Sequence, residues 1–162
     1  MKVLVAYYSK TGNTEKVARA ICDALPGTGT IAPIKDLETA EGYDLVFCGF
    51  PVQAHSVPAQ AQPFLKGLDK GQKVAFFSTH GSLRGGTLPK QAFENAISLA
   101  GHTVTLGHFG CRGKVEPDII DMLKQKDEHR AWAEEALSAD GHPDQADLED
   151  AKAWVKNMVA KA

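Results

Sequence analysis

The chain has 162 residues, with 43% hydrophobic and 23% charged side chains, which is typical of a single globular domain. Its formal net charge is only −2, so we expect no nucleic-acid partner. No apolar run approaches the roughly 20 residues that a membrane-spanning helix needs, and the N-terminus lacks a signal-peptide pattern. These features predict one cytoplasmic domain over residues 1–162 with no membrane association.

Apolar runs rich in β-branched and aromatic residues predict five strands, in chain order at 2–8, 30–35, 44–49, 73–78 and 103–109. The clearest runs are hydrophobic almost throughout, which indicates strands covered on both faces of a sheet. The second run is interrupted by Pro33, which has no backbone N–H to donate to a neighbouring strand. The second strand is therefore predicted at an edge of the sheet.

Helical spacing of apolar residues predicts helices from about residue 13, and at 59–68, 88–100 and 144–161. The stretch 116–138 predicts one additional surface helix after the fifth strand, with Pro117 in its first turn. Alternating strands and helices imply right-handed crossovers and a parallel sheet. We therefore expect a doubly wound α/β fold: a five-stranded parallel sheet of order 2-1-3-4-5, with helices on both faces.

Small polar residues fill the turn between the first strand and the first helix, in the order Ser9, Lys10, Thr11, Gly12, Asn13, Thr14. Serine and threonine hydroxyls can donate hydrogen bonds, and a glycine lets the backbone approach a ligand closely. Backbone amides and the positive end of the helix dipole also favour an anion here. Helix capping alone would require only one such residue. The turn therefore predicts a phosphate site.

The sequence from Ser9 to Thr14 resembles the S/T-x-T-G-N-T loop that wraps the FMN phosphate in flavodoxins. It has neither the glycines of a dinucleotide fold nor the lysine placement of a P-loop. The likeness spans most of residues 1–109 and the final helix. It implies a flavodoxin-like fold, an FMN cofactor, electron transfer, and transient contacts with redox partner proteins.

Two long loops follow the third and fourth strands, where ligands bind in open α/β sheets. Gly49-Phe50-Pro51 and Thr79-His80-Gly81 resemble the flavodoxin loops that flank the isoalloxazine ring. The resemblance implies cofactor contacts from these residues: Pro51, Val52, Gln53, Ala54, His55, Thr79, His80, Gly81 and Ser82. Neither loop contains the tryptophan or tyrosine that commonly stacks on the flavin in this family. A positive charge on His80 would stabilise a reduced, anionic flavin if this ring lies at the N1 edge.

The cysteines Cys22, Cys48 and Cys111 lie far apart and form no C-x-x-C, which argues against a disulfide framework or a zinc site. The six histidines show no metal-ligand spacing, so no metal is expected. Cys111 precedes Arg112 and Lys114. These charges would lower the pKa of its thiol if they lie close to it, and otherwise Cys111 is a structural residue.

No side chain is predicted to be catalytic, because a bound flavin would supply the redox chemistry. Two alternatives to an electron carrier stay open. One is an FMN-dependent oxidoreductase of the NAD(P)H/quinone type, or the flavin-bearing component of a larger reductase. The other is an interaction module that has this fold without a flavin.

Overall fold

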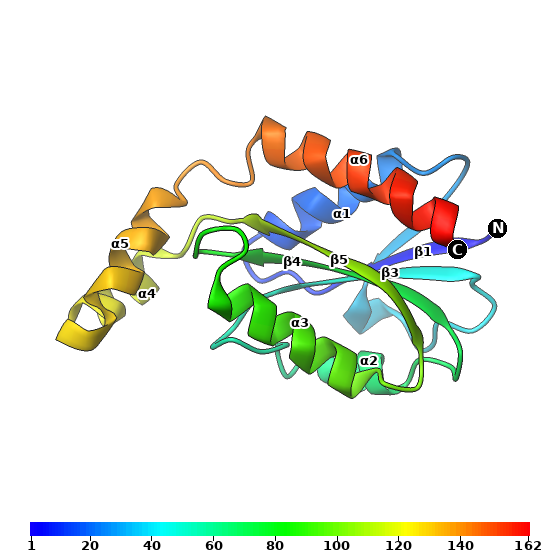
Figure 1. The fold of residues 1–162 in the computed structure, drawn as a ribbon, viewed down its shortest axis with the longest axis horizontal. Coiled ribbons are helices and arrows are strands. Elements are labelled where there is room, and N and C mark those ends of the chain that lie inside the picture. The colour runs from blue at the N-terminus through cyan, green and yellow to red at the C-terminus, as the bar shows by residue number, and fades with distance from the viewer.

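The computed structural model describes residues 1–162, and its centre is a parallel sheet in the order β2-β1-β3-β4-β5 (Figure 1). The strands are β1 (Val3–Tyr7), β2 (Thr30–Pro33), β3 (Leu45–Pro51), β4 (Lys73–His80) and β5 (Val104–Arg112). Every neighbouring pair is parallel. The predicted strand order is confirmed, and β2 lies at an edge.

Helices cover both faces of this sheet (Figure 1). One face carries α1 (Asn13–Asp23) and α6 (Gln145–Lys161). The other carries α2 (Gln62–Lys66) and α3 (Thr87–Leu99). A short 3₁₀ helix, η1 (Ile34–Asp36), follows β2. The predicted doubly wound α/β fold is therefore confirmed. None of the helices combines the length and the hydropathy needed to cross a membrane.

The alternation of side chains along each strand divides the core into two layers. Along β1, Val3 and Val5 join the cluster beneath α1 and α6, whereas Leu4 and Ala6 join the cluster beneath α2 and α3. Because both faces are covered, nearly every position of the central strands is buried. This explains the near-continuous apolar runs in the sequence.

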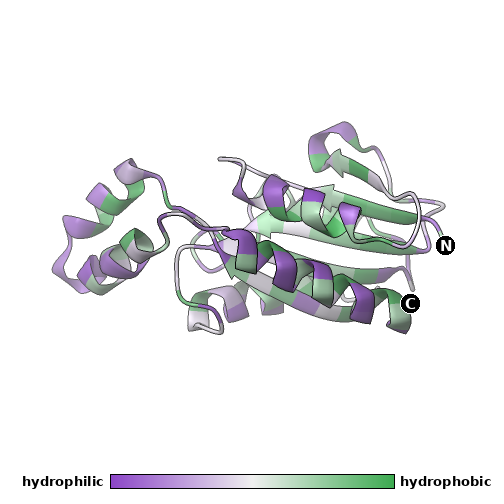
Figure 2. Cartoon of the chain, turned by 90° about the horizontal axis from the view of Figure 1, so that it is seen from above, coloured by the Kyte–Doolittle hydropathy of each residue, from purple (hydrophilic) through white to green (hydrophobic).

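The stretch 116–138, predicted as one helix, forms a helical hairpin. It contains α4 (Pro117–Lys124), a 3₁₀ helix η2 (Asp127–His129) and α5 (Arg130–Ser138). Ile120 of α4 packs with Ala133 and Ala136 of α5 in a small cluster of its own. A single straight helix would separate these apolar residues, so the chain turns back at η2 to bury them together. The hairpin projects beyond the carboxyl edge of the sheet (Figures 1 and 2).

Three strands continue further than predicted, and they carry predicted loop residues into the sheet. Pro51 pairs with Thr79, and His80 pairs with Arg112 in the parallel ladder. Pro51, Thr79 and His80 are therefore strand-end residues rather than loop residues. The carbonyls of Thr79 and His80 accept from the N–H of Val52 at 2.8 Å and of Gly113 at 2.9 Å, which places the loops that follow at the carboxyl edge.

Candidate functional site

The turn between β1 and α1 lies at the carboxyl edge of the sheet. Gly12 has a φ of 95°, in the left-handed region that residues with a Cβ rarely adopt, and it caps the start of α1. Ser9 Oγ accepts hydrogen bonds from the N–H of Gly12 at 3.1 Å and of Glu15 at 3.3 Å. These two bonds close the turn over the first residues of α1.

Several donors in this turn have no protein partner. The backbone N–H groups of Lys10, Thr11, Asn13 and Thr14 donate to no acceptor within the chain. They lie at the positive end of the α1 dipole. The hydroxyl hydrogen of Ser9 also remains free, because Ser9 Oγ acts only as an acceptor. A phosphate group fits this donor set, because its oxygens offer acceptors at the positions that lack them.

Thr14 connects the turn to the neighbouring loop. Its Oγ1 lies 2.9 Å from Thr79 Oγ1 at the end of β4, and both residues are buried. One hydroxyl of the pair donates to the other, so a single hydroxyl hydrogen remains for a ligand. The pair holds the start of α1 at a defined separation from the end of β4.

A cleft of about 520 Å³ opens beside the same turn. Thr11 and Asn13 lie in its wall, and the residues that follow β5 form its other side. Its charged lining includes Glu116 and three lysines: Lys10, Lys16 and Lys114. Lys10 pairs with Glu116 at 3.4 Å and Lys114 with Asp140 at 3.1 Å, both on the surface, so the excess positive charge of the cleft comes from Lys16. The cleft therefore adds to the attraction of the turn for an anion.

The loop after β3 makes a tight two-residue turn. The N–H of Gln53 donates to the carbonyl of Ser56 at 3.2 Å, and the N–H of Ser56 donates to the carbonyl of Gln53 at 3.0 Å. The two residues at the tip, Ala54 and His55, have φ values of 45° and 58°. Left-handed backbone is unfavourable for residues with a Cβ, so this exposed tip is strained.

Both ends of this loop are anchored to neighbouring elements. The N–H of Val52 donates to the carbonyl of Thr79 at 2.8 Å, which extends the pairing of β3 with β4. The N–H of Val57 donates to Asn95 Oδ1 of α3 at 3.0 Å. The strained turn is therefore held between two fixed points at the carboxyl edge.

The loop after β4 is held by Arg112, the last residue of β5. Arg112 Nε donates to the carbonyl of Ser82 at 3.2 Å, and Nη2 donates to that of Gly81 at 3.1 Å. Nη2 also donates to the carbonyl of Glu135 and to Ser138 Oγ, each at 2.7 Å. A cation is favourable at this carboxyl end of α5. Arg112 therefore joins the β4 loop to the hairpin.

Gly81 lies directly against the base of the hairpin. A Cβ at this position would lie 2.3 Å from Val115 Cγ2 and 3.6 Å from Ala136 Cβ. The close approach explains why a glycine stands here. It also makes the hairpin one wall beside the β4 loop.

His80 lies beneath the β4 loop and is only 5% exposed. Its Nδ1 donates to the carbonyl of Ser82 at 2.8 Å. Burial lowers the pKa of His80, and the charges of Arg112 and Arg84 lower it further. The imidazole is therefore neutral at pH 7. The hypothesis that His80 stabilises a reduced flavin then concerns a neutral ring and not a full positive charge.

The sequence interpretation did not single out a second histidine in this region. His108 stacks on Phe93 with ring centroids 4.4 Å apart, and its Nε2 lies 3.1 Å from Ser78 Oγ. Burial lowers the pKa of His108 to about 4, and His80 acts in the same direction. Side chains alternate along β5, so His108 and Arg112 lie on one face of the sheet. This spacing in the sequence could have predicted that they share a face.

The tip of the β4 loop is fastened to α6. Arg84 Nη1 lies 2.7 Å from Asp150 Oδ2, and its guanidinium stands 5.4 Å from the centre of the Phe109 ring. Arg84 is thus engaged with α6 rather than with the turn from Ser9 to Thr14. Next to it, Leu83 is 53% exposed.

Cys111 is a core residue. It belongs to the cluster beneath α1 and α6, and burial raises the pKa of its thiol to about 12. Of the two alternatives for Cys111, the structural one therefore holds, and the pKa is not lowered for a geometric reason. Successive residues of a strand point to opposite faces, so the guanidinium of Arg112 lies on the other side of the sheet.

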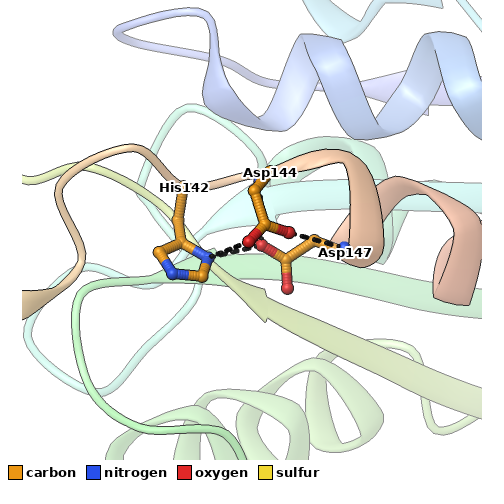
Figure 3. Close-up of side chains that lie close together, drawn as sticks. All are labelled: His142, Asp144 and Asp147. Carbon is orange, nitrogen blue, oxygen red and sulfur yellow. Dashed lines mark hydrogen bonds and ion pairs between the residues drawn. The ribbon is translucent and has the colours of Figure 1, made fainter.

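A histidine and two aspartates meet at the start of α6 (Figure 3). Asp147 Oδ2 accepts from His142 Nδ1 at 2.6 Å and from the N–H of Asp144 at 2.9 Å. Asp144 Oδ1 accepts from the N–H of Asp147 at 2.9 Å, which completes a capping box. Helix capping thus accounts for Asp144 and Asp147, and His142 is held by its hydrogen bond to Asp147.

Comparison with known proteins gives consistent matches. The family model of the flavodoxin domain matches residues 4–156. The chain is 30% identical over 174 residues to the flavodoxin-like domain-containing protein BilS of Clostridioides difficile (strain CD3). This match covers 100% of this chain and 98% of that protein.

Solved structures with low sequence identity share the fold. The structure of oxidised flavodoxin 2 from Bacillus cereus is 19% identical with a TM-score of 0.64, and the match covers 100% of both chains. A flavoprotein from Lactobacillus acidophilus NCFM, solved in complex with FMN, is 20% identical with a TM-score of 0.54. That match covers 67% of this chain and 92% of the other.

Proposed function

The chain belongs to the flavodoxin domain family, and on this basis we propose that it binds FMN and carries electrons between partner proteins. The observation that carries the proposal is the set of unpaired N–H donors at the start of α1, within a sequence that matches the family's phosphate loop. Bound FMN supplies the electron-transfer chemistry. No side chain of this chain has to act as an acid, a base or a nucleophile.

The three loops at the carboxyl edge would each contact a different part of FMN. The turn from Ser9 to Thr14 would hold the phosphate through its backbone amides and the Ser9 hydroxyl. The β3 and β4 loops would flank the isoalloxazine ring through these residues: Val52, Gln53, Ala54, His55, His80, Gly81 and Ser82. The Thr14–Thr79 pair and Arg112 would keep the loops in place before the cofactor arrives.

A specific observation favours a second candidate function, an FMN-dependent oxidoreductase. Neither loop contains a tryptophan or tyrosine to cover the ring, and the loop tips at Ala54, His55 and Leu83 are exposed. A flavin with an uncovered face would be accessible to a nicotinamide or a quinone. Oxidation of NAD(P)H by the FMN-loaded protein with a quinone present would support this candidate, and the absence of turnover would favour the carrier.

The first test is a titration of flavin-free protein with FMN, FAD and riboflavin, followed by flavin fluorescence. We expect tight binding of FMN and much weaker binding of riboflavin, because riboflavin lacks the phosphate that the turn would hold. Equal affinity for FMN and riboflavin would contradict the role of the Ser9–Thr14 turn. If no flavin binds, the remaining candidate is an interaction module that has this fold without a flavin.

A further inference from the structure

The hairpin, residues 116–138, is not needed to build either main core. Neither 16-residue cluster contains a residue of this segment, and the hairpin has its own cluster of Ile120, Ala133 and Ala136. It projects beyond the carboxyl edge, where the three loops of the candidate site also lie (Figures 1 and 2). A partner that touches the hairpin would therefore also stand close to these loops.

The hairpin exposes large apolar side chains although it is small. Met122 is 62% exposed, and Trp132 and Leu137 are each 47% exposed. Trp132 stacks on His129 with ring centroids 4.8 Å apart, so the indole is oriented at the surface. Aromatic and methionine side chains are enriched at protein interfaces, and tryptophan is a frequent energetic anchor there.

The charge of the hairpin differs from that of the rest of the chain. The hairpin has seven acidic and three basic side chains, a net charge of −4. The other 139 residues have 13 acidic and 15 basic side chains, a net charge of +2. The net charge of −2 for the whole chain is therefore the sum of an acidic hairpin and a slightly basic remainder. An acidic patch attracts a basic partner over distances set by ionic strength.

From these observations we infer that the hairpin is a docking arm for a redox partner protein with a basic surface around its redox centre. The inference rests on the proposed electron-transfer function. The acidic charge disfavours anionic lipid headgroups, and it disfavours a second copy placed hairpin against hairpin. A basic protein surface complements both the charge and the exposed apolar side chains.

Arg112 gives this arm a fixed position relative to the site. Its guanidinium donates to Gly81 and Ser82 on the β4 loop and to Glu135 and Ser138 at the end of α5. The packing of Gly81 against Val115 adds a second rigid contact. A partner held by the hairpin is thereby held at a defined distance from the β4 loop, as electron transfer requires.

Ferric cytochrome c, a small basic haem protein, serves as the probe partner. We compare a hairpin variant, Asp118→Lys with Asp121→Lys and Glu134→Lys, with a control variant, Glu38→Lys with Glu41→Lys and Asp69→Lys. All six side chains are exposed and none belongs to an ion pair, so both variants change the net charge equally without removing a salt bridge. Affinity for cytochrome c is measured by calorimetry on the flavin-free protein at about 10 mM salt, where the Debye length is about 30 Å.

The hairpin variant should bind cytochrome c about 10-fold more weakly than the wild type, and the control at most about 2-fold more weakly. The difference should vanish in high salt. With FMN bound and fully reduced by dithionite beforehand, the rate of cytochrome c reduction should follow the same pattern. One electron leaves the flavin for each haem iron that passes from ferric to ferrous.

The two tryptophans of the chain locate the contact. In the Trp154→Phe variant only Trp132 remains, and a docked haem should quench its fluorescence. In the Trp132→Phe variant the remaining Trp154, which packs against Phe47 and Phe109, should be quenched far less.

Equal loss of affinity in the two charge variants, or equal quenching of the two tryptophans, would contradict the proposal that the hairpin is a docking arm. Failure of the proposed function is a separate result. It would show as absence of FMN binding in the wild type, whatever the hairpin variants do.

Discussion

Arg112 Nη2 lies 3.1 Å from the carbonyl oxygen of Gly81, at the point where the β4 loop meets the hairpin. The same nitrogen reaches the carbonyl of Glu135 at 2.7 Å. One planar guanidinium thus satisfies carbonyls from two segments, a geometry that the single ammonium of a lysine cannot reproduce. The β4 loop and the hairpin are therefore expected to respond together when this residue changes.

Arg112→Lys should lower the free energy of unfolding by about 1–3 kcal/mol, because carbonyls that now accept charge-assisted hydrogen bonds lose their donor. It should also weaken FMN binding, since the β4 loop loses its anchor. Urea unfolding and a flavin titration measure the two effects. Arg84→Lys is the matched control, because its exposed pair with Asp150 should contribute less than about 1 kcal/mol. Equal effects at both arginines would contradict the anchoring role.

Gly12→Ala should destabilise the protein by about 1–2 kcal/mol, because the φ of 95° is unfavourable for a residue with a Cβ. Steric overlap is not the cause, since an added Cβ would meet nothing within 4 Å. If the backbone shifts to relieve this strain, FMN affinity should fall as well. Gly101→Ala is a suitable control, because its φ lies outside the left-handed region and its added Cβ would make ordinary contacts of 3.6 Å. Thermal unfolding of both variants should show a drop mainly for the first.

Thr14→Val and Thr79→Val should each cost about 1–3 kcal/mol, because each leaves one buried hydroxyl without its partner. The double variant should cost clearly less than the sum of the two, since both hydroxyls are then gone. A double-mutant cycle by urea denaturation measures this coupling. Additive effects would mean that the 2.9 Å contact does not stabilise the junction between α1 and β4.

Stability should fall as the pH is lowered from about 6.5 towards 4. The pKa of His108 in the folded protein is about 4, below its unfolded value of 6.5, so the unfolded chain binds more protons in this window. The contribution reaches at most about 3 kcal/mol, and the lowered pKa of buried His80 acts with the same sign. Unfolding measured between pH 4.5 and 7.5 should show a shallower slope for His108→Gln than for the wild type. An unchanged slope would exclude His108 as a source of the pH dependence.

The sequence by itself determined the fold class and the strand order, and it singled out Ser9 to Thr14 as a candidate anion site. Each inference rests on contiguous residues: near-continuous apolar runs for buried strands, helical spacing for the covering helices, and a run of small polar residues for the candidate site. Pro33 predicted the edge strand for the same local reason, since one missing N–H limits where a strand can pair. Such signals survive in a single sequence because they depend on backbone geometry within a few residues.

The tertiary structure alone decided how these parts are joined. Thr14 meets Thr79 across 65 positions, and Arg112 meets Gly81 and Glu135 across 31 and 23. It also decided that residues 116–138 form two helices rather than one, and that Cys111 and Arg112 point to opposite faces of the sheet. These outcomes depend on which distant segments the folded sheet brings together. The periodicity of a short segment does not indicate which distant segment it will contact. That contact depends on packing and burial in the completely folded chain.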